Sequence, residues 1–219
     1  MMDQLFSTGR REIASGAVHV PGWLTVEQQR WLVGVCREWA RGPVPMRSAL
    51  LPGGHRMSVR MVSLGWHWQP YRYSRTADDA GGGRVADLPE WLADLGRSAV
   101  AEAYQDPAAA QRYRPDTAQV NFYDDAARMG MHQDKDERVS DPVVSLSIGA
   151  TCLFRFGNTL TRTRPWTDVE LASGDLFVFG GPSRFAYHGV PRILPGTCDP
   201  GTGLKTGRVN ITLRVTGLT

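Results

Sequence analysis

Apolar and polar residues alternate in short runs along most of this chain, and glycine and proline separate the runs. Seven such runs cover residues 57–62, 118–123, 143–148, 152–156, 168–171, 175–179 and 208–216. A period of two places apolar side chains on one face of a β-strand, and many short strands at intervals of about 8 to 12 residues are typical of a sandwich or barrel. The pattern therefore predicts a mainly β protein of the α+β class.

Two other segments carry apolar residues at helical spacing. Residues 25–28, Thr-Val-Glu-Gln, form a capping-box pattern that predicts a helix ending near Gly42. A second helix is predicted to begin near Pro89 and to continue through Tyr104. We expect both helices to buttress a β-core, the first of them within an N-terminal segment, residues 1–48, that also contributes a strand.

Two residues of the segment that follows residue 130 are candidate metal ligands. His132 and Asp134 are two residues apart, so in an extended segment their side chains project to the same side. A later histidine, His188, can complete a set of three. Two neutral imidazoles and one carboxylate on one face of an octahedron suit non-haem Fe(II), because the open face is free to bind and activate O₂. A His-x-Asp pair alone is common by chance, so this hypothesis depends on the rest of the chain.

The last alternating run strengthens the metal hypothesis. It places Arg208, Asn210, Thr212 and Arg214 on one face of a strand. Polar residues on a strand usually face water, but this strand would lie inside a compact β-core, where an unpaired guanidinium is costly. The two arginines are about 20 Å apart along the strand, and their long side chains can close on both ends of a small diacid. Iron and a diacid clamp together suggest 2-oxoglutarate.

These residues together resemble the AlkB family of Fe(II)/2-oxoglutarate dioxygenases, which remove alkyl groups from nucleic-acid bases. The similarity runs from about Pro52 to Arg214 and is greatest to the bacterial DNA-repair members. It rests on the pattern His132-x-Asp134-x-Asp136-Glu137, then His188, then Arg208-x-Asn210-x-Thr212-x-Arg214. The resemblance implies a double-stranded β-helix, or jelly-roll, core. It also implies Fe(II) held by His132, Asp134 and His188, O₂ as oxidant, and 2-oxoglutarate bound by Asn121, Tyr123, Arg208, Asn210 and Arg214.

Residues 50–75 mix aromatic and basic side chains, which suits a surface where bases stack and phosphates are neutralised. A hairpin whose aromatic residues cover the core would show the same mixture. The resemblance implies that the segment is a nucleotide-recognition lid in which Trp66 stacks on the flipped base, with Trp68 as the alternative. It further implies that Tyr71 and Tyr73 contact the nucleic-acid backbone.

Two more residues are expected on the substrate side. If the strand period persists, Asp136 points to the same side as His132, whereas Glu137 points elsewhere. Arg162, in a basic loop, corresponds to a substrate-side basic residue of the family. N1-methyladenine and N3-methylcytosine are cationic, so an indole face and a nearby carboxylate should prefer them to their neutral parents.

The resemblance thus implies oxidative demethylation of N1-methyladenine and N3-methylcytosine in DNA, with release of formaldehyde, as direct-reversal repair. Single-stranded DNA is the favoured partner, because the target base must leave the stack. The alternatives are the same chemistry on RNA or protein, and a catalytically inactive nucleic-acid-binding module.

Composition adds little to this interpretation. The 219 residues fit one domain, residues 1–219, and the net charge of +3 permits a polyanionic partner without requiring one. Three cysteines without CxxC spacing indicate neither a disulfide framework nor a thiolate zinc site. With no signal-peptide pattern and no run approaching the ~20 apolar residues of a membrane span, we expect a monomeric cytoplasmic protein without membrane contact.

Overall fold

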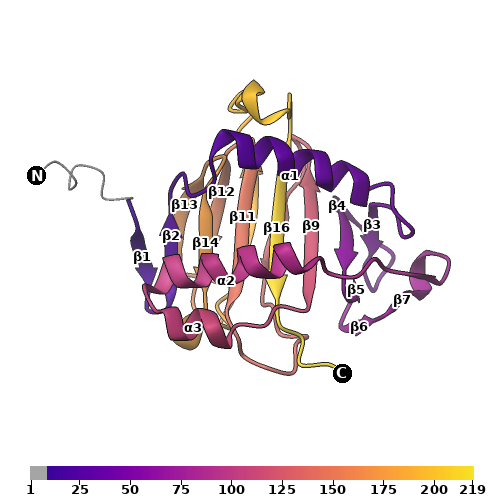
Figure 1. Cartoon of the computed structure of the whole chain (residues 1–219), viewed down its shortest axis with the longest axis horizontal. Coiled ribbons are helices and arrows are strands. Elements are labelled where there is room, and N and C mark those ends of the chain that lie inside the picture. The colour runs from indigo at the N-terminus through magenta and orange to yellow at the C-terminus, as the bar shows by residue number, and fades with distance from the viewer. Residues whose placement is uncertain (1–8) are drawn as a thin grey trace, which may run out of the picture.

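The alternating runs form two antiparallel sheets that lie face to face, and helices cover the outer face of the larger one (Figure 1). The structure, a computed structural model, describes residues 9–219. In spatial order, the strands of the large sheet are β1 (Arg11–Ala14), β2 (Ala17–Val20), β14 (Leu176–Phe179), β11 (Val143–Gly149), β16 (Arg208–Arg214), β9 (Thr117–Tyr123), β4 (Arg56–Leu64) and β3 (Arg47–Leu50). Those of the small sheet are β10 (Met129–His132), β15 (His188–Ile193), β12 (Cys152–Phe156) and β13 (Thr167–Leu171).

The predicted jelly-roll class is confirmed, and each of the seven predicted runs contains a strand. A strand was expected within residues 1–48, where β1 and β2 lie, but most of the other short strands were not predicted. Two of them, β10 and β15, carry the candidate histidines. Two small hairpins connect β4 to the helical layer: β5 (His67–Gln69) with β6 (Arg72–Ser74), and β7 (Thr76–Ala77) with β8 (Gly83–Arg84). Short 3-10 helices lie in three of the connections: η1 (Asp78–Ala80) between β7 and β8, η2 (Gly181–Ser183) between β14 and β15, and η3 (Pro200–Thr202) between β15 and β16.

Helices α1 (Val26–Trp39) and α2 (Glu90–Tyr104) lie side by side across the large sheet, as the buttress prediction requires (Figure 1). The Thr25 side chain accepts from the backbone N–H of Gln28, and the Gln28 side chain accepts from Thr25 N–H, so the capping box is present. A third, short helix, α3 (Pro107–Arg112), follows α2. The core under the helices is aliphatic, and strand β16 contributes Val209, Ile211 and Leu213 to it.

A second core fills the space between the two sheets. Its centre is aromatic: Phe154 and Phe156 of the small sheet contact Phe177 of the large sheet, with ring centroids 4.9 and 5.3 Å apart. This core occupies one end of the interlayer space. At the other end, the inward side chains of β9 and β16 are polar, and the sheets enclose a cavity.

The register of β9 and β16 fixes the polar lining of that cavity. The two strands are antiparallel neighbours in which Arg208 lies opposite Tyr123 and Asn210 opposite Asn121. Cross-strand partners project to the same face. The polar set of one strand therefore lies directly beside the polar set of the other, while the aliphatic residues between them face the helices.

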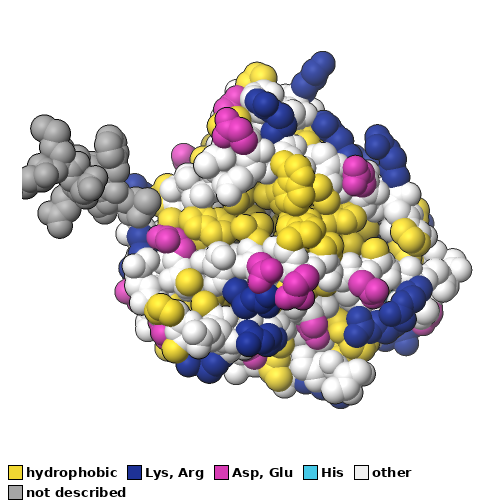
Figure 2. Space-filling model, in the orientation of Figure 1, with side chains coloured by type: hydrophobic (Ala, Val, Ile, Leu, Met, Phe, Trp, Pro, Cys, Tyr) yellow, Lys and Arg dark blue, Asp and Glu magenta, His cyan; other side chains and the backbone are white. Residues whose placement is uncertain are grey.

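Hydrophobic side chains gather on the helical face of the molecule, between α1 and α2 (Figure 2). Trp31 and Trp39 of α1 both contact Trp91 of α2, at centroid distances of 4.6 and 5.8 Å. Trp31 is 54% exposed. Among residues 9–219, the helices are too short and too polar to cross a bilayer.

Candidate metal centre

Two histidines face each other across neighbouring strands of the small sheet. His132 is the last residue of β10 and His188 is the first of β15, and the antiparallel register pairs them directly. Their ring centroids are 4.4 Å apart. Because cross-strand partners share a face, this pairing alone brings together two imidazoles that are distant in the sequence.

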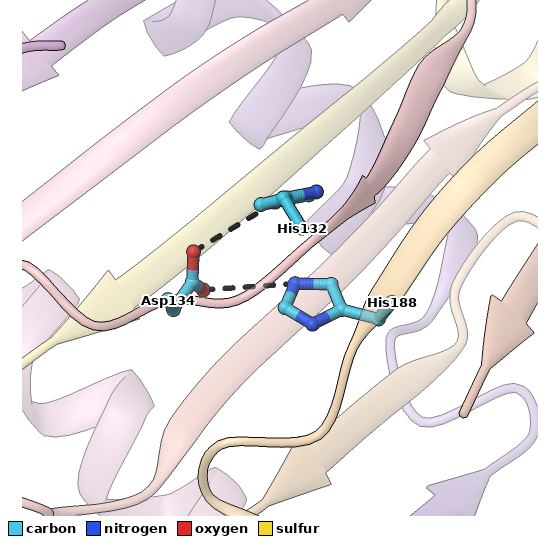
Figure 3. A group of neighbouring side chains, drawn as sticks. All are labelled: His132, Asp134 and His188. Atoms are coloured by element: carbon cyan, nitrogen blue, oxygen red, sulfur yellow. Dashed lines mark ion pairs between the residues drawn. The ribbon is translucent and has the colours of Figure 1, made fainter. Parts of the chain in front are cut away.

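Asp134 completes the group from the loop that follows β10 (Figure 3). Its two carboxylate oxygens each lie 3.8 Å from a histidine Nε2, one from that of His132 and the other from that of His188. One ligand atom of each residue lies within 4.8 Å of those of the other two. Donors that bind one ion at about 2 Å are up to about 4 Å apart, so small side-chain rotations suffice to bring all three onto one ion.

A hydrogen bond at the Nδ1 atom of each imidazole fixes its tautomer. Nδ1 of His132 lies 2.9 Å from the carbonyl oxygen of Gly130, and Nδ1 of His188 lies 3.0 Å from that of Ala186. A carbonyl only accepts, so each Nδ1 carries the proton and each Nε2 presents its lone pair. Histidines that bind metals are typically oriented by such a bond.

Electrostatics around Asp134 favour the charge states that a metal requires. Burial raises the pKa of Asp134, but the Arg214 guanidinium, 2.8 Å away, and the two imidazoles outweigh burial, so the pKa lies well below its usual range. Burial and the neighbouring His132 lower the pKa of His188 to about 4. At neutral pH the carboxylate is therefore charged and His188 is neutral, as metal ligands must be.

The three candidate ligands lie on the wall of a cavity of about 690 Å³ between the two sheets. The cavity brings together nearly all the residues that the sequence predicted for the site. It is lined by His132, Asp134 and His188, by Asn121, Tyr123, Arg208, Asn210 and Arg214, and by Tyr71, Tyr73, Asp136 and Arg162. Ligands occupy cavities of this size in many proteins.

The polar end of the cavity fits an anionic co-substrate. Arg208 is 2% exposed, and one of its nitrogens donates to the Ser147 hydroxyl. Its Nε and Nη1, and Oδ1 of Asn121, are buried and find no hydrogen-bond partner among residues 9–219. A buried guanidinium with two free donors is costly unless an anion completes it. A carboxylate supplies two acceptors in the geometry that a guanidinium recognises.

The second arginine has a different environment from the one expected. Arg214 donates through Nε to Asp134 at 2.9 Å and through Nη1 to Gln119 at 3.2 Å. It thus braces a candidate metal ligand while it also lines the cavity. The sequence suggested two equivalent arginines. Among residues 9–219, however, Arg208 has no acidic partner, whereas Arg214 forms an ion pair with Asp134.

The two tryptophans of the lid segment, Trp66 and Trp68, do not lie where the resemblance implied. Trp66 is 8% exposed, does not line the cavity, and lies with its ring 3.8 Å from the guanidinium carbon of Arg75. Trp68 lines the cavity instead, and its Nε1 donates to Asp136 at 2.8 Å. Side chains two residues apart share a face only in a regular strand, and Trp66 lies in the bend that begins at Gly65, with φ of 74°, before β5 starts at His67. Of the two tryptophans, it is Trp68, the alternative that the sequence analysis named, that lines the cavity.

The remaining substrate-side residues reach the cavity from different elements. Tyr71 is 73% exposed and sits in the turn between β5 and β6 with φ of 72°, a conformation that is rare for a bulky residue. Tyr73 donates from its hydroxyl to Glu137 at 2.6 Å. Arg162 lies over Tyr187 at 5.9 Å. All three contribute to the rim or wall of the cavity.

Sequence reasoning misplaced Glu137 and did not find Arg184. Glu137 was expected to point away from the site, but the chain leaves strand geometry after His132, and its side chain, 2% exposed, lines the cavity. It pairs at 3.0 Å with Arg184, which is buried four residues before His188. Ser145 and Ser147 of β11 were also missed. Their alternation with Val144 and Leu146 was a signal that could have found them, because the same period marks β9 and β16.

The chain is similar to 2-oxoglutarate-dependent dioxygenases in both sequence and structure. Residues 16–214 match the 2OG-Fe(II) oxygenase superfamily. The alpha-ketoglutarate-dependent dioxygenase AlkB homolog of Caulobacter vibrioides is 40% identical over 200 residues, 89% of this chain and 84% of that protein. The DNA N(6)-methyladenine demethylase ALKBH1D of Arabidopsis thaliana is 31% identical over 227 residues, 95% of this chain and 51% of that protein. The solved structure of OsALKBH1 superposes with a TM-score of 0.82 at 29% identity, covering 94% of this chain and 100% of that one.

Proposed function

This chain belongs to the AlkB family of the 2OG-Fe(II) oxygenase superfamily, and from that premise we propose that it oxidatively demethylates alkylated bases in DNA. The proposed substrates are N1-methyladenine and N3-methylcytosine, and the products are the restored base and formaldehyde, with succinate and CO₂ formed from 2-oxoglutarate. Fe(II), 2-oxoglutarate and O₂ supply the oxidation of the N-methyl group when they are bound. The protein binds and orients these groups and the base.

His132, Asp134 and His188 would hold the iron. The carbonyl groups of Gly130 and Ala186 keep both Nε2 atoms directed at one point, and Arg214 keeps Asp134 ionised. All three side chains line the cavity, so an ion that they held would be accessible from it. The protein would thus hold the metal without covering the side on which substrate is expected.

Arg208 would bind the far carboxylate of 2-oxoglutarate, and its two unpaired donors are the single observation that carries this assignment. Tyr123 packs against the guanidinium, whose carbon is 5.3 Å from the ring centroid. Asn121 and Asn210, which are hydrogen-bonded to each other at 3.2 Å, would complete the polar end. The co-substrate would then extend from Arg208 towards the metal.

Trp68 and Asp136 would select the damaged base. The hydrogen bond between them fixes the indole at the cavity wall, so its face is available for stacking. A cationic base gains from both the π-face and the adjacent carboxylate, whereas a neutral base gains only from stacking. The pocket therefore favours the methylated, positively charged bases over their parents.

Basic residues at the cavity would guide the nucleic acid to it. Arg128, Lys135 and Arg162 are exposed and line the cavity, next to the exposed ring of Tyr71. Exposed cations of this kind neutralise phosphates and make affinity depend on salt concentration. The chain's small net charge conceals this local excess of positive charge.

The decisive experiment is formaldehyde release from a single-stranded DNA oligonucleotide that carries one N1-methyladenine. Fe(II) and 2-oxoglutarate are omitted in turn, and matched RNA and methylated-peptide substrates are run in parallel. Turnover on DNA that requires both additions supports the proposal. Turnover on RNA or peptide alone would support the proposed oxidative demethylation but refute DNA as its substrate. Binding without turnover would favour the non-catalytic nucleic-acid-binding alternative.

A further inference from the structure

Arg184 is a buried cation that does not touch the candidate ligand side chains. It follows η2 on the segment that leads into β15, four residues before His188, and its side chain is 1% exposed. A charged group in such a position must be compensated by its neighbours. The identity of those neighbours indicates what the residue does.

Every nitrogen group of the Arg184 guanidinium donates to the loop that carries Asp134. Nη1 donates to the backbone carbonyl of Asp134 at 2.6 Å, Nη2 to the carboxylate of Glu137 at 3.0 Å, and Nε to the carbonyl of Asp141 at 2.6 Å. Charge-assisted hydrogen bonds are roughly twice as strong as neutral ones. One planar group thus fixes this loop at three points.

The same contacts connect the two segments that supply metal ligands. Arg184 belongs to the segment of His188, and Ala186, which orients the His188 ring, lies between them in the chain. Asp134 belongs to the loop that Arg184 holds. The spacing between the Asp134 and His188 side chains therefore depends on the Arg184 contacts.

The β5–β6 hairpin attaches to the same loop. Trp68 and Tyr73 are cross-strand partners in that hairpin, and they donate hydrogen bonds to consecutive loop residues, Asp136 and Glu137. The Glu137 carboxylate therefore accepts from Tyr73 with one oxygen and from Arg184 with the other. A continuous series of hydrogen bonds runs from the hairpin to the backbone of Asp134.

We propose that Arg184 is a positioning residue that sets the geometry of the metal site and, through Glu137 and Tyr73, couples docking of the hairpin to that geometry. This inference rests on the proposed function, because it assumes that the three ligands bind iron. Its expected consequence is reciprocal: weakening the Arg184 contacts lowers metal affinity, and metal binding stabilises the hairpin.

Binding of Mn(II), a redox-stable probe for the iron site, tests the proposal without any turnover. Isothermal titration compares the wild-type protein with R184K, which keeps the charge but replaces the three separate donor nitrogens of the planar guanidinium with a single ammonium nitrogen. Its matched control is R192K, the same exchange at an exposed arginine of β15. Loss of residues that orient ligands typically costs 10- to 100-fold in metal affinity. We expect a loss of that size in R184K and none in R192K.

The possible outcomes distinguish failure of the metal site from failure of the positioning role of Arg184. If the wild-type protein fails to bind Mn(II), the metal site itself is refuted. If it binds and R184K binds equally well, the positioning role is refuted even if R184K has a lower melting temperature. Should R184K fail to fold, E137Q decides, because it keeps side-chain size and removes the charge that holds the Arg184 guanidinium in position. We expect about 10-fold weaker Mn(II) binding in E137Q, and unchanged binding would overturn the inference.

Hydrogen exchange tests the coupling to the hairpin. In the wild-type protein, Mn(II) should slow amide exchange in residues 67–74, and in Y73F, which loses only the hydroxyl, this slowing should be reduced. A slowing of equal size in both proteins would show that the hairpin responds to the metal by another route, and it would overturn the coupling half of the proposal.

Discussion

The indole nitrogen of Trp68 donates a hydrogen bond of 2.8 Å to the carboxylate of Asp136, two residues beyond the candidate ligand Asp134. An aromatic ring of the lid hairpin is therefore locked to the metal loop. We therefore expect a bound base to contact Trp68 and not Trp66.

Substitution of Trp68 should affect nucleic-acid binding specifically. Base–aromatic stacking contributes about 1–3 kcal/mol per base, so W68A should raise KM for an N1-methyladenine oligonucleotide by about 5- to 150-fold and leave KM for 2-oxoglutarate nearly unchanged. W68F, which keeps a ring, should have a smaller effect. W66F is the control, since Trp66 lies outside the cavity. Equal defects in W66F and W68F would contradict the assignment.

Removal of the metal ligands should abolish Mn(II) binding in each case but affect stability differently. D134A removes the nearer ion-pair partner of the Arg214 guanidinium, which is 8% exposed, and leaves only Glu137, at 3.6 Å, to compensate it. Removing one member of a buried pair costs about 3–5 kcal/mol. H132A removes a partly exposed ring and should cost about 1 kcal/mol. Urea unfolding of the metal-free proteins measures both, and equal losses would show that Arg214 is not dependent on Asp134.

Arg208 should destabilise the folded protein and contribute to binding of the co-substrate. Its guanidinium is buried with two unpaired donors among the residues described. R208M keeps the length of the side chain and removes the charge, so it should raise the free energy of unfolding by about 1–2 kcal/mol, as apolar replacement of buried charge often does. Saturating 2-oxoglutarate should raise the melting temperature of the metal-loaded wild-type protein and leave that of R208M unchanged. A destabilised R208M that still responds to 2-oxoglutarate would refute the role.

The metal-free protein should lose stability as the pH falls below about 6.5. Burial lowers the pKa of His188 to about 4, below that of an ordinary histidine. Between those two values the unfolded chain binds more protons than the folded one, so the free energy of unfolding decreases as the pH is lowered, by about 3 kcal/mol in total. Urea unfolding in EDTA at pH 7 and pH 5 tests this. H188Q should show a shallower pH dependence, and an identical one would contradict the prediction.

The sequence was sufficient for the parts of the site that lie on regular strands. In β9 and β16 the period of two holds from end to end, so the inward positions of Asn121, Tyr123, Arg208 and Arg214 could be read from the alternation. The capping box at Thr25 fixed the start of α1 for a similar reason, since its signal is local.

The errors lie where backbone geometry changes. Trp66 was assigned to the base-stacking position from the resemblance, but it lies in the bend at residues 65–66, between β4 and β5, and does not line the cavity. Glu137 was assigned to the wrong side because the chain stops being extended after His132. Arg184 carried no local signal at all: its partners are 43 to 50 residues away, and only the folded chain brings them together.

The helices and the cavity lie on opposite faces of the large sheet, with eight strands of the described chain between them (Figure 1). Side chains on the outer surface of α1 therefore have no direct path to the catalytic wall. A dye, an affinity tag or a sensor surface attached at the exposed Trp31, after its exchange for cysteine, would leave the mouth of the cavity facing free solution. The molecule can therefore be immobilised through its helical face for assays of ligand capture and release at the cavity.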